Sequence, residues 1–126
     1  MIILLITTGL VACTTDQYSG EERTVLEGQV NSSNDNPLDG LIVSLYPVFD
    51  IPEDGNIRQL ETMYLSNPIS SVKIDNSGKI SLSFPKHEKT DVYCIEIKKD
   101  YTTKYYGYIS RYNTVNHYIN VGTLIF

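Results

Sequence analysis

The sequence predicts an all-β protein, built as an antiparallel β-sandwich of seven or eight strands. Apolar and polar residues alternate along most of the chain after residue 24, which is the period of a strand with one buried face. No stretch shows the 3.6-residue period of an amphipathic helix. Clusters of Asn, Asp, Gly, Pro and Ser interrupt the alternation about every ten residues, a spacing typical of short strands joined by turns.

The first half of this domain contains three predicted strands. A strand at residues 25–30 is followed by the turn sequence Asn-Ser-Ser-Asn-Asp-Asn-Pro and by a strand at residues 41–46. Pro47 ends the second strand or marks it as an edge, because proline has no N–H to donate to a neighbour. A second turn cluster at residues 50–56 precedes a weaker strand at residues 58–65.

The second half begins with a predicted hairpin. Val72 and Ile74 lead into the turn Asp-Asn-Ser-Gly, and residues 80–84 alternate on the return. After a loop, residues 93–97 alternate again. Two more β-rich segments close the chain, at residues 102–112 and 118–126.

Alternation also predicts which side chains form the core, because every second residue of a strand points to the same face. The predicted core is Leu26, Val30, Val43, Leu45, Val72, Ile74, Ile80, Leu82, Phe84, Tyr93, Ile95 and Ile97.

The N-terminus carries a different signal. Residues 2–12 are uncharged and mostly apolar, and they end in Leu-Val-Ala followed by Cys13. A transmembrane helix needs about 20 apolar residues, whereas this run has the length of the apolar part of a signal peptide. A buried first strand is the alternative interpretation. The ending resembles the lipobox of bacterial lipoproteins, in which a small residue precedes an invariant cysteine.

That resemblance implies an organisation for the whole chain. Residues 1–12 are expected to be a cleaved signal peptide, residues 13–23 a lipidated cysteine with a polar tether, and residues 24–126 the sandwich domain. The sulfur of Cys13 would carry a diacylglyceryl group and its amine a further acyl chain such as palmitate. Two acyl chains hold a protein stably on a bilayer. The expected location is the bacterial cell envelope, with the protein lipid-anchored at the outer membrane or cell surface.

Several motifs in the domain share the order found in another family. Residues 25–30 (Val-Leu-Glu-Gly-Gln-Val) precede the Pro-Leu-Asp-Gly turn and apolar strand of residues 37–45. Residues 71–80 and the Tyr-Cys-Ile-Glu-Ile strand at residues 93–97 follow in the same order. The pattern resembles carboxypeptidase-regulatory-like (transthyretin-like) domains. The resemblance implies a Greek-key sandwich of the prealbumin type, similar to immunoglobulin-like sandwiches, which is commonly an accessory module without catalysis of its own.

No motif in the sequence predicts catalysis, a metal site or a cofactor. There is no Gly-x-Ser-x-Gly elbow and no phosphate-binding glycine loop. The two histidines, His87 and His117, lack metal-ligand spacing, and Cys94 has no recognisable activating base. Asp50, Glu53, Asp54 and Asn56 offer oxygens to calcium but do not match the EF-hand loop, and a solvated acidic loop is the favoured interpretation. The net charge of −5 argues against nucleic acid as a partner.

Tyrosines are concentrated near the C-terminal end of the domain. If residues 102–112 form one strand, Tyr105, Gly107 and Ile109 share one face, and the opposite face carries Lys104, Tyr106, Tyr108 and Tyr112. That second set is the candidate ligand-binding face, because tyrosine combines a flat apolar ring with a hydroxyl. The other interpretation is that tyrosine simply favours half-buried strands.

Taken together, these features predict a non-enzymatic binding or accessory module, held on a membrane through Cys13. Its expected ligand is a glycan or an envelope protein. The alternative is a structural subunit that offers a strand edge to a larger envelope assembly.

The lipid anchor can be tested directly. Cys13→Ser should abolish acyl labelling and release the protein from the membrane fraction, because the thiol that carries the diacylglyceryl group is gone. Radiolabelled palmitate incorporation and detergent partitioning measure both effects, with Cys94→Ser as the control that should keep the label. Unchanged partitioning of Cys13→Ser would exclude the anchor.

Overall fold

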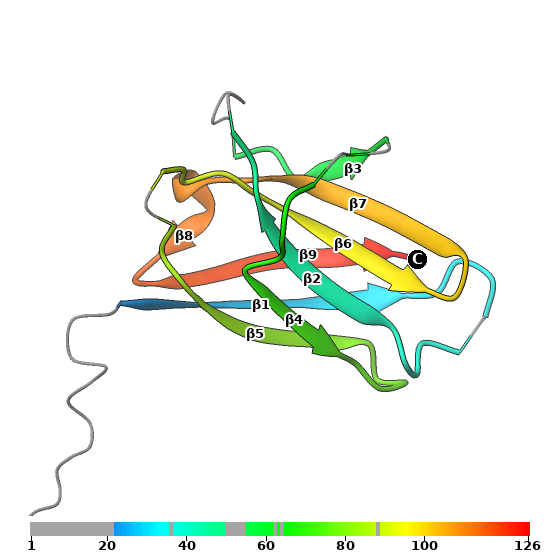
Figure 1. Ribbon diagram of the computed structural model, residues 1–126. Helices are drawn as coiled ribbons and strands as arrows, with labels where there is room; N and C mark the ends of the chain where they lie inside the picture. Colours follow the sequence, from blue (N-terminus) through cyan, green and yellow to red (C-terminus); the bar gives the residue numbers. More distant parts are fainter. Residues whose placement is uncertain (1–21, 36, 50–54, 62, 64, 88) are drawn as a thin grey trace, which may run out of the picture.

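The computed structural model describes residues 22–126 except 36, 50–54, 62, 64 and 88. In this part of the chain two β-sheets pack face to face (Figure 1), and the one helical segment is a single 3-10 turn. The four-stranded sheet has the order β5-β1-β9-β8, and the five-stranded sheet has the order β3-β7-β6-β2-β4. The strands are β1 (Arg23–Asn31), β2 (Ile42–Pro47), β3 (Arg58–Leu60), β4 (Ser70–Lys73), β5 (Lys79–Pro85), β6 (Tyr93–Lys99), β7 (Thr102–Ile109), β8 (Thr114–Val115) and β9 (Tyr118–Ile125), with the 3-10 turn η3 at Arg111–Asn113.

The all-β fold class is confirmed, with one exception to the antiparallel prediction. The first and last strands, β1 and β9, pair in parallel, and every other pair is antiparallel. Alternation cannot reveal this direction, because it fixes which face of a strand is buried and not which neighbour the strand takes.

The predicted hairpin at residues 75–78 is wrong. β4 pairs with β2 and β5 pairs with β1, so the turn carries the chain from one sheet to the other. The Asn76 side-chain oxygen accepts hydrogen bonds from the backbone N–H groups of Leu38 and Asp39. Gly78 has φ of +76°, and a Cβ there would lie 2.2 Å from the Val30 carbonyl oxygen. Tertiary contacts therefore override the local hairpin signal.

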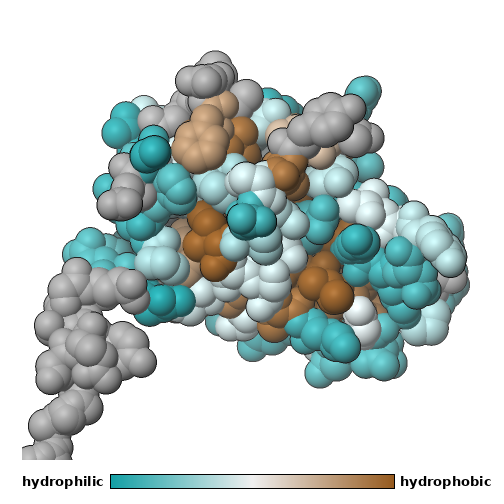
Figure 2. Space-filling model, in the orientation of Figure 1, coloured by the Kyte–Doolittle hydropathy of each residue, from teal (hydrophilic) through white to brown (hydrophobic). Residues whose placement is uncertain are grey.

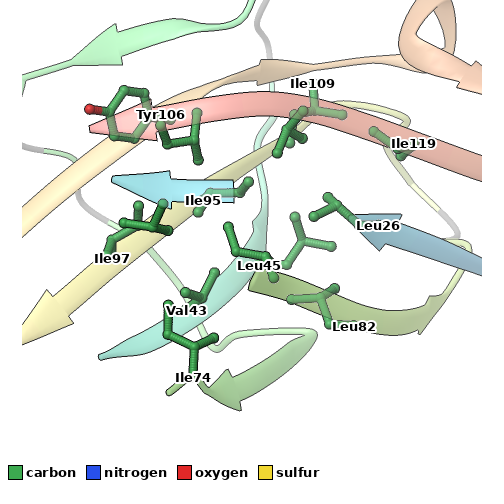
Figure 3. Close-up of a cluster of buried hydrophobic side chains, with 14 of the residues drawn as sticks. Leu26, Val43, Leu45, Ile74, Leu82, Ile95, Ile97, Tyr106, Ile109 and Ile119 are labelled. Carbon is green, nitrogen blue, oxygen red and sulfur yellow. The ribbon is translucent and has the colours of Figure 1, made fainter. Parts of the chain in front are cut away.

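The core lies between the sheets, and both inner faces contribute to it. Figure 3 shows Leu26 and Ile119 on one sheet pointing toward Leu45 and Ile95 on the other. Eleven of the twelve predicted core residues are buried, and the exception is Val72, which is half-buried on the edge strand β4. The core also contains residues that were not predicted: Leu38, Leu41, Tyr106, Ile109, Ile119, Val121 and Leu124.

Two predicted strands are shorter in the structure. Among the described residues of the segment 58–65, those in a strand are Arg58–Leu60. The segment 102–112 stops being a strand after Ile109, because Ser110 and Asn113 form a capping box that starts η3. In it, the Asn113 side chain accepts the Ser110 N–H, and the Ser110 hydroxyl accepts the Tyr112 N–H.

The core assignment predicts a large difference between buried and exposed positions on β5. Phe84→Ala should lower the free energy of unfolding by about 3–5 kcal/mol, because it removes a fully buried ring that contacts Tyr93 edge-on. Ser81→Ala on the exposed face should change it by less than about 0.5 kcal/mol. Urea denaturation of both variants measures the difference, and equal losses would mean that the assigned faces are wrong.

Candidate functional site

The predicted tyrosine face does not exist as one surface. Tyr93 pairs with Ile109 and Ile95 pairs with Tyr106, so two steps along β6 match three steps along β7. This bulge in β7 reverses the alternation between Tyr106 and Ile109, and both side chains point into the core. The Tyr106 ring is only 7% exposed, and its hydroxyl donates to the carbonyl of Ile125.

The other three residues of that set lie in separate places. Tyr108 follows the bulge and packs on the outer face of the five-stranded sheet. Tyr112 lies in η3, where its ring is 65% exposed and Arg111 stacks over it. Lys104 is half-buried beside the Phe126 ring. The prediction that Lys104, Tyr106, Tyr108 and Tyr112 share one exposed face is therefore wrong.

The outer face of the five-stranded sheet carries a second apolar cluster. Val48, Val92 and Cys94 are buried there under partly buried side chains that include Leu60, Met63 and Leu65. Burial, followed by the charge of Glu96, raises the pKa of Cys94 to about 12. The thiol is therefore protonated at neutral pH, and the geometry gives Cys94 a packing role, not a nucleophilic one.

Beside this cluster, one row of outward-facing residues crosses the same sheet. In the strand register, Tyr105 on β7 lies opposite Glu96 on β6. Glu96 lies opposite Ser44 on β2, which in turn lies opposite Ser71 on β4. The two serine hydroxyls are 2.8 Å apart and hydrogen-bonded. Tyr46, two residues after Ser44 on β2, faces the same way and packs partly against the second apolar cluster.

Two tyrosines flank the carboxylate in this row. The Tyr46 hydroxyl donates to Glu96 Oε1 over 3.4 Å, and Tyr105 lies opposite Glu96 in the strand register. We call Tyr46, Glu96 and Tyr105 the carboxylate platform. All three side chains are half-buried, so each is supported by its surroundings and still reaches the surface.

The electrostatics of the carboxylate platform follow from this geometry. Burial first, and the charge of Glu96 second, raise the pKa of both Tyr46 and Tyr105. Both phenols therefore stay protonated at neutral pH, and the Tyr46 phenol donates to the carboxylate. A carboxylate has about four acceptor positions, so Glu96 keeps capacity for further donors. The site offers hydrogen-bond acceptors between two aromatic rings, with Lys98 exposed two residues further along β6.

Part of this site was readable from the sequence. The alternation of residues 41–46 and 93–97 already places Tyr46 and Glu96 opposite the core residues. Tyr105 was assigned to the wrong group, because the bulge in β7 has no signal in the residue pattern. Nothing in the sequence shows that β2, β6 and β7 are neighbours in one sheet.

A concave feature lies at one end of the sandwich. A cleft with a volume of about 300 Å³ opens between the sheets, with Phe84, Tyr93 and Ile119 among its lining residues. Elsewhere on the surface, Figure 2 shows apolar side chains in separate patches among polar ones.

The remaining sequence candidates are not brought together. His87 packs edge-on against Phe49, whereas His117 lies 3.9 Å from a carboxylate oxygen of Glu22. Within the described ranges, no three His, Cys, Asp or Glu side chains are grouped closely enough to hold a metal ion. Cys13, Asp50, Glu53 and Asp54 lie outside the described residues, and Asn56 is exposed.

Comparisons with known proteins add no assignment. The chain matches no family model, and no curated protein or solved structure matches it either. In the part of the chain that the structure covers, no helix has the length and apolar character required to cross a bilayer.

The carboxylate platform predicts a specific tyrosine titration. Glu96→Gln should lower the pKa of Tyr46 and Tyr105, without bringing it to the ordinary value of about 10, because burial is the larger cause of the rise. A raised phenol pKa stabilises the folded state below about pH 10, and this contribution is lost as the pH rises through the folded pKa. Phenolate absorbance during an alkaline titration measures the shift.

Glu27→Gln provides the matched control. Tyr118 donates to Glu27 over 2.9 Å on the outer face of the other sheet, and this bond is the first cause that raises the pKa of Tyr118. Glu27→Gln should therefore lower the pKa of Tyr118 and leave the pKa of Tyr46 and Tyr105 unchanged. An identical titration of Glu96→Gln and the wild-type protein would contradict the assigned contacts.

Proposed function

We propose that this protein is a lipid-anchored, non-catalytic binding module of the bacterial cell envelope, and that its ligand is a glycan held on the carboxylate platform. The observation that carries the proposal is that two tyrosines flank Glu96: the Tyr46 hydroxyl donates to its carboxylate, and Tyr105 lies opposite it in the strand register. Aromatic rings pack against the apolar faces of sugar rings, and a carboxylate accepts hydrogen bonds from sugar hydroxyls. The platform supplies both on one sheet face.

The anchor in this proposal is Cys13, acylated after removal of residues 1–12. The supporting observation is the Leu-Val-Ala-Cys sequence that follows the apolar run. The next residues, 14–22, are polar and would act as a tether. Together they support an outer-membrane or cell-surface location, with the domain held close to the lipid.

The fold relationship belongs to the proposal as well. We assign the domain to the carboxypeptidase-regulatory-like, prealbumin-type sandwiches with Greek-key topology. The motifs at residues 25–30, 37–45, 71–80 and 93–97 support this, and so does the two-sheet all-β architecture. An accessory role agrees with the protonated, buried thiol of Cys94.

A second candidate function is that of an assembly subunit. It is favoured by β9, which runs from Tyr118 to Ile125 but pairs with β8 only at Tyr118 and Ile119. The side of β9 beyond those two residues is an edge to which a partner could add a strand. The Tyr106 hydroxyl already bonds the Ile125 carbonyl, and the Asn120 side chain already bonds the Gly122 N–H. Fewer backbone groups of β9 are therefore available to a partner strand, so we favour the platform.

The glycan proposal is tested by a glycan array followed by calorimetry with the strongest neutral glycan. Glu96→Gln should weaken binding at least about tenfold, or about 1.4 kcal/mol, because it removes the charged acceptor and retains the shape of the side chain. Glu27→Gln should bind like the wild-type protein. No glycan bound by the wild-type protein, or equal losses in the two variants, would refute the platform and favour the assembly role.

A further inference from the structure

The cleft at the end of the sandwich, which we call the end cleft, has an apolar floor formed by both sheets. Phe84 of β5 and Ile119 of β9 come from one sheet, and Tyr93 of β6 comes from the other. Phe84 and Tyr93 pack edge-on, with ring centroids 5.1 Å apart. The volume of about 300 Å³ is that of a small ligand site.

One buried polar group in the end cleft has no side-chain hydrogen bond to any residue that the structure describes. Thr24 lines the end cleft and is only 9% exposed, because it shares the inward face of β1 with Leu26. Among the described residues, its hydroxyl makes no hydrogen bond. Buried hydroxyls in proteins are nearly always satisfied by protein, water or ligand. The Thr24 hydroxyl is therefore placed to bond a molecule that enters the end cleft.

Charged side chains of both signs surround the apolar floor. Lys86 lies 3.8 Å from a carboxylate oxygen of Asp91 in a loosely held ion pair, and the Nε2 atom of His117 lies 3.9 Å from a carboxylate oxygen of Glu22. Arg111 lines the same opening. A rim with separate cationic and anionic groups matches a ligand that carries both charges a few ångströms apart, and a simple anion would be repelled by Asp91 and Glu22.

The position of the end cleft indicates where such a ligand comes from. Glu22 lines the end cleft, and in Figure 1 the chain enters β1 at the end of the sandwich where β8 lies. Cys13 precedes Glu22 by nine residues, which span at most about 32 Å when fully extended. An acylated Cys13 would therefore keep the end cleft close to the lipid headgroups. Tyr112 and Val115, both well exposed, lie next to Arg111 and Thr114 of its lining.

We infer that the end cleft binds a phosphoethanolamine headgroup of the membrane in which the protein is anchored. The phosphate would lie beside Lys86 and Arg111, the ammonium group beside Glu22 and Asp91, and the Thr24 hydroxyl would donate to an ester oxygen. The inference rests on the proposed anchor at Cys13 for the source of the ligand. It is independent of the carboxylate platform.

Titration with soluble headgroups tests the chemistry. The acylated full chain in a polyoxyethylene detergent is titrated with phosphoethanolamine, and the amide NMR shifts of Thr24, Tyr93 and Ile119 are followed. Saturable shifts at these residues are expected, with inorganic phosphate and ethanolamine each binding at least about tenfold more weakly. No saturation, or equal binding of inorganic phosphate, would overturn the inference.

Thr24→Val tests the buried hydroxyl, because valine keeps the shape of threonine and removes the oxygen. The variant should keep its melting temperature and bind phosphoethanolamine at least about fivefold more weakly. Thr123→Val, at an exposed position on β9, should change neither quantity. A lower melting temperature for Thr24→Val would show a structural partner for the hydroxyl and overturn the inference.

Vesicles test the source of the ligand. Hydrogen exchange at residues 22–26 should be slower in vesicles containing phosphatidylethanolamine than in pure phosphatidylcholine vesicles. If soluble phosphoethanolamine binds but hydrogen exchange is equal in the two kinds of vesicle, the membrane is not the source of the ligand and that part of the inference is overturned. Acyl labelling of Cys13 and glycan binding are measured separately and do not involve Thr24, so failure of the end cleft is distinguishable from failure of the anchor or the platform.

Discussion

The parallel pairing of β1 with β9 is the contact on which the rest of the structure depends. β1 lies inside the four-stranded sheet, between β5 and β9, and it brings the first and last strands of the domain together. The register shifts between Glu27 and Gln29, and a Cβ on Gly28 would lie 2.4 Å from the Val121 side chain. Only glycine allows this approach without displacing Val121. The floor of the end cleft depends on it too, because the pairing sets Ile119 beside Leu26.

Each sheet carries a hydrogen-bonded tyrosine–glutamate pair on its outer face, but the two pairs have different surroundings. On the four-stranded sheet, Tyr118 and Glu27 form a simple pair in which Tyr118 is 39% exposed. On the five-stranded sheet, Tyr46 rests against a buried apolar cluster while its hydroxyl bonds Glu96. A ring that is already held by packing loses less conformational freedom when a ligand binds. This difference in preorganisation is why we propose the platform, and not the simple pair, as the binding site.

The sequence pattern predicted local structure better than it predicted contacts between distant segments. Alternation identified the strands and nearly all of the core residues it named, because a buried face leaves a period of two in the chain. It missed the parallel partner of β1 and the crossing at residues 75–78, since both depend on which strands become neighbours. The tyrosine face failed for a local reason. A single extra residue in β7 turned Ile109 to the same side as Tyr106, and no residue type marks that bulge.

The closure of the sheet by its final strand has a consequence for the order of events during biosynthesis. Until residues 118–125 have been synthesised, β1 lacks one neighbour, and the inner side chains Ile119, Val121 and Leu124 are missing from the core. The four-stranded sheet is therefore completed only when β9 has been made, whereas every strand of the five-stranded sheet lies before residue 110. The order of synthesis lets the five-stranded sheet form first, and part of the core stays open until β9 joins β1.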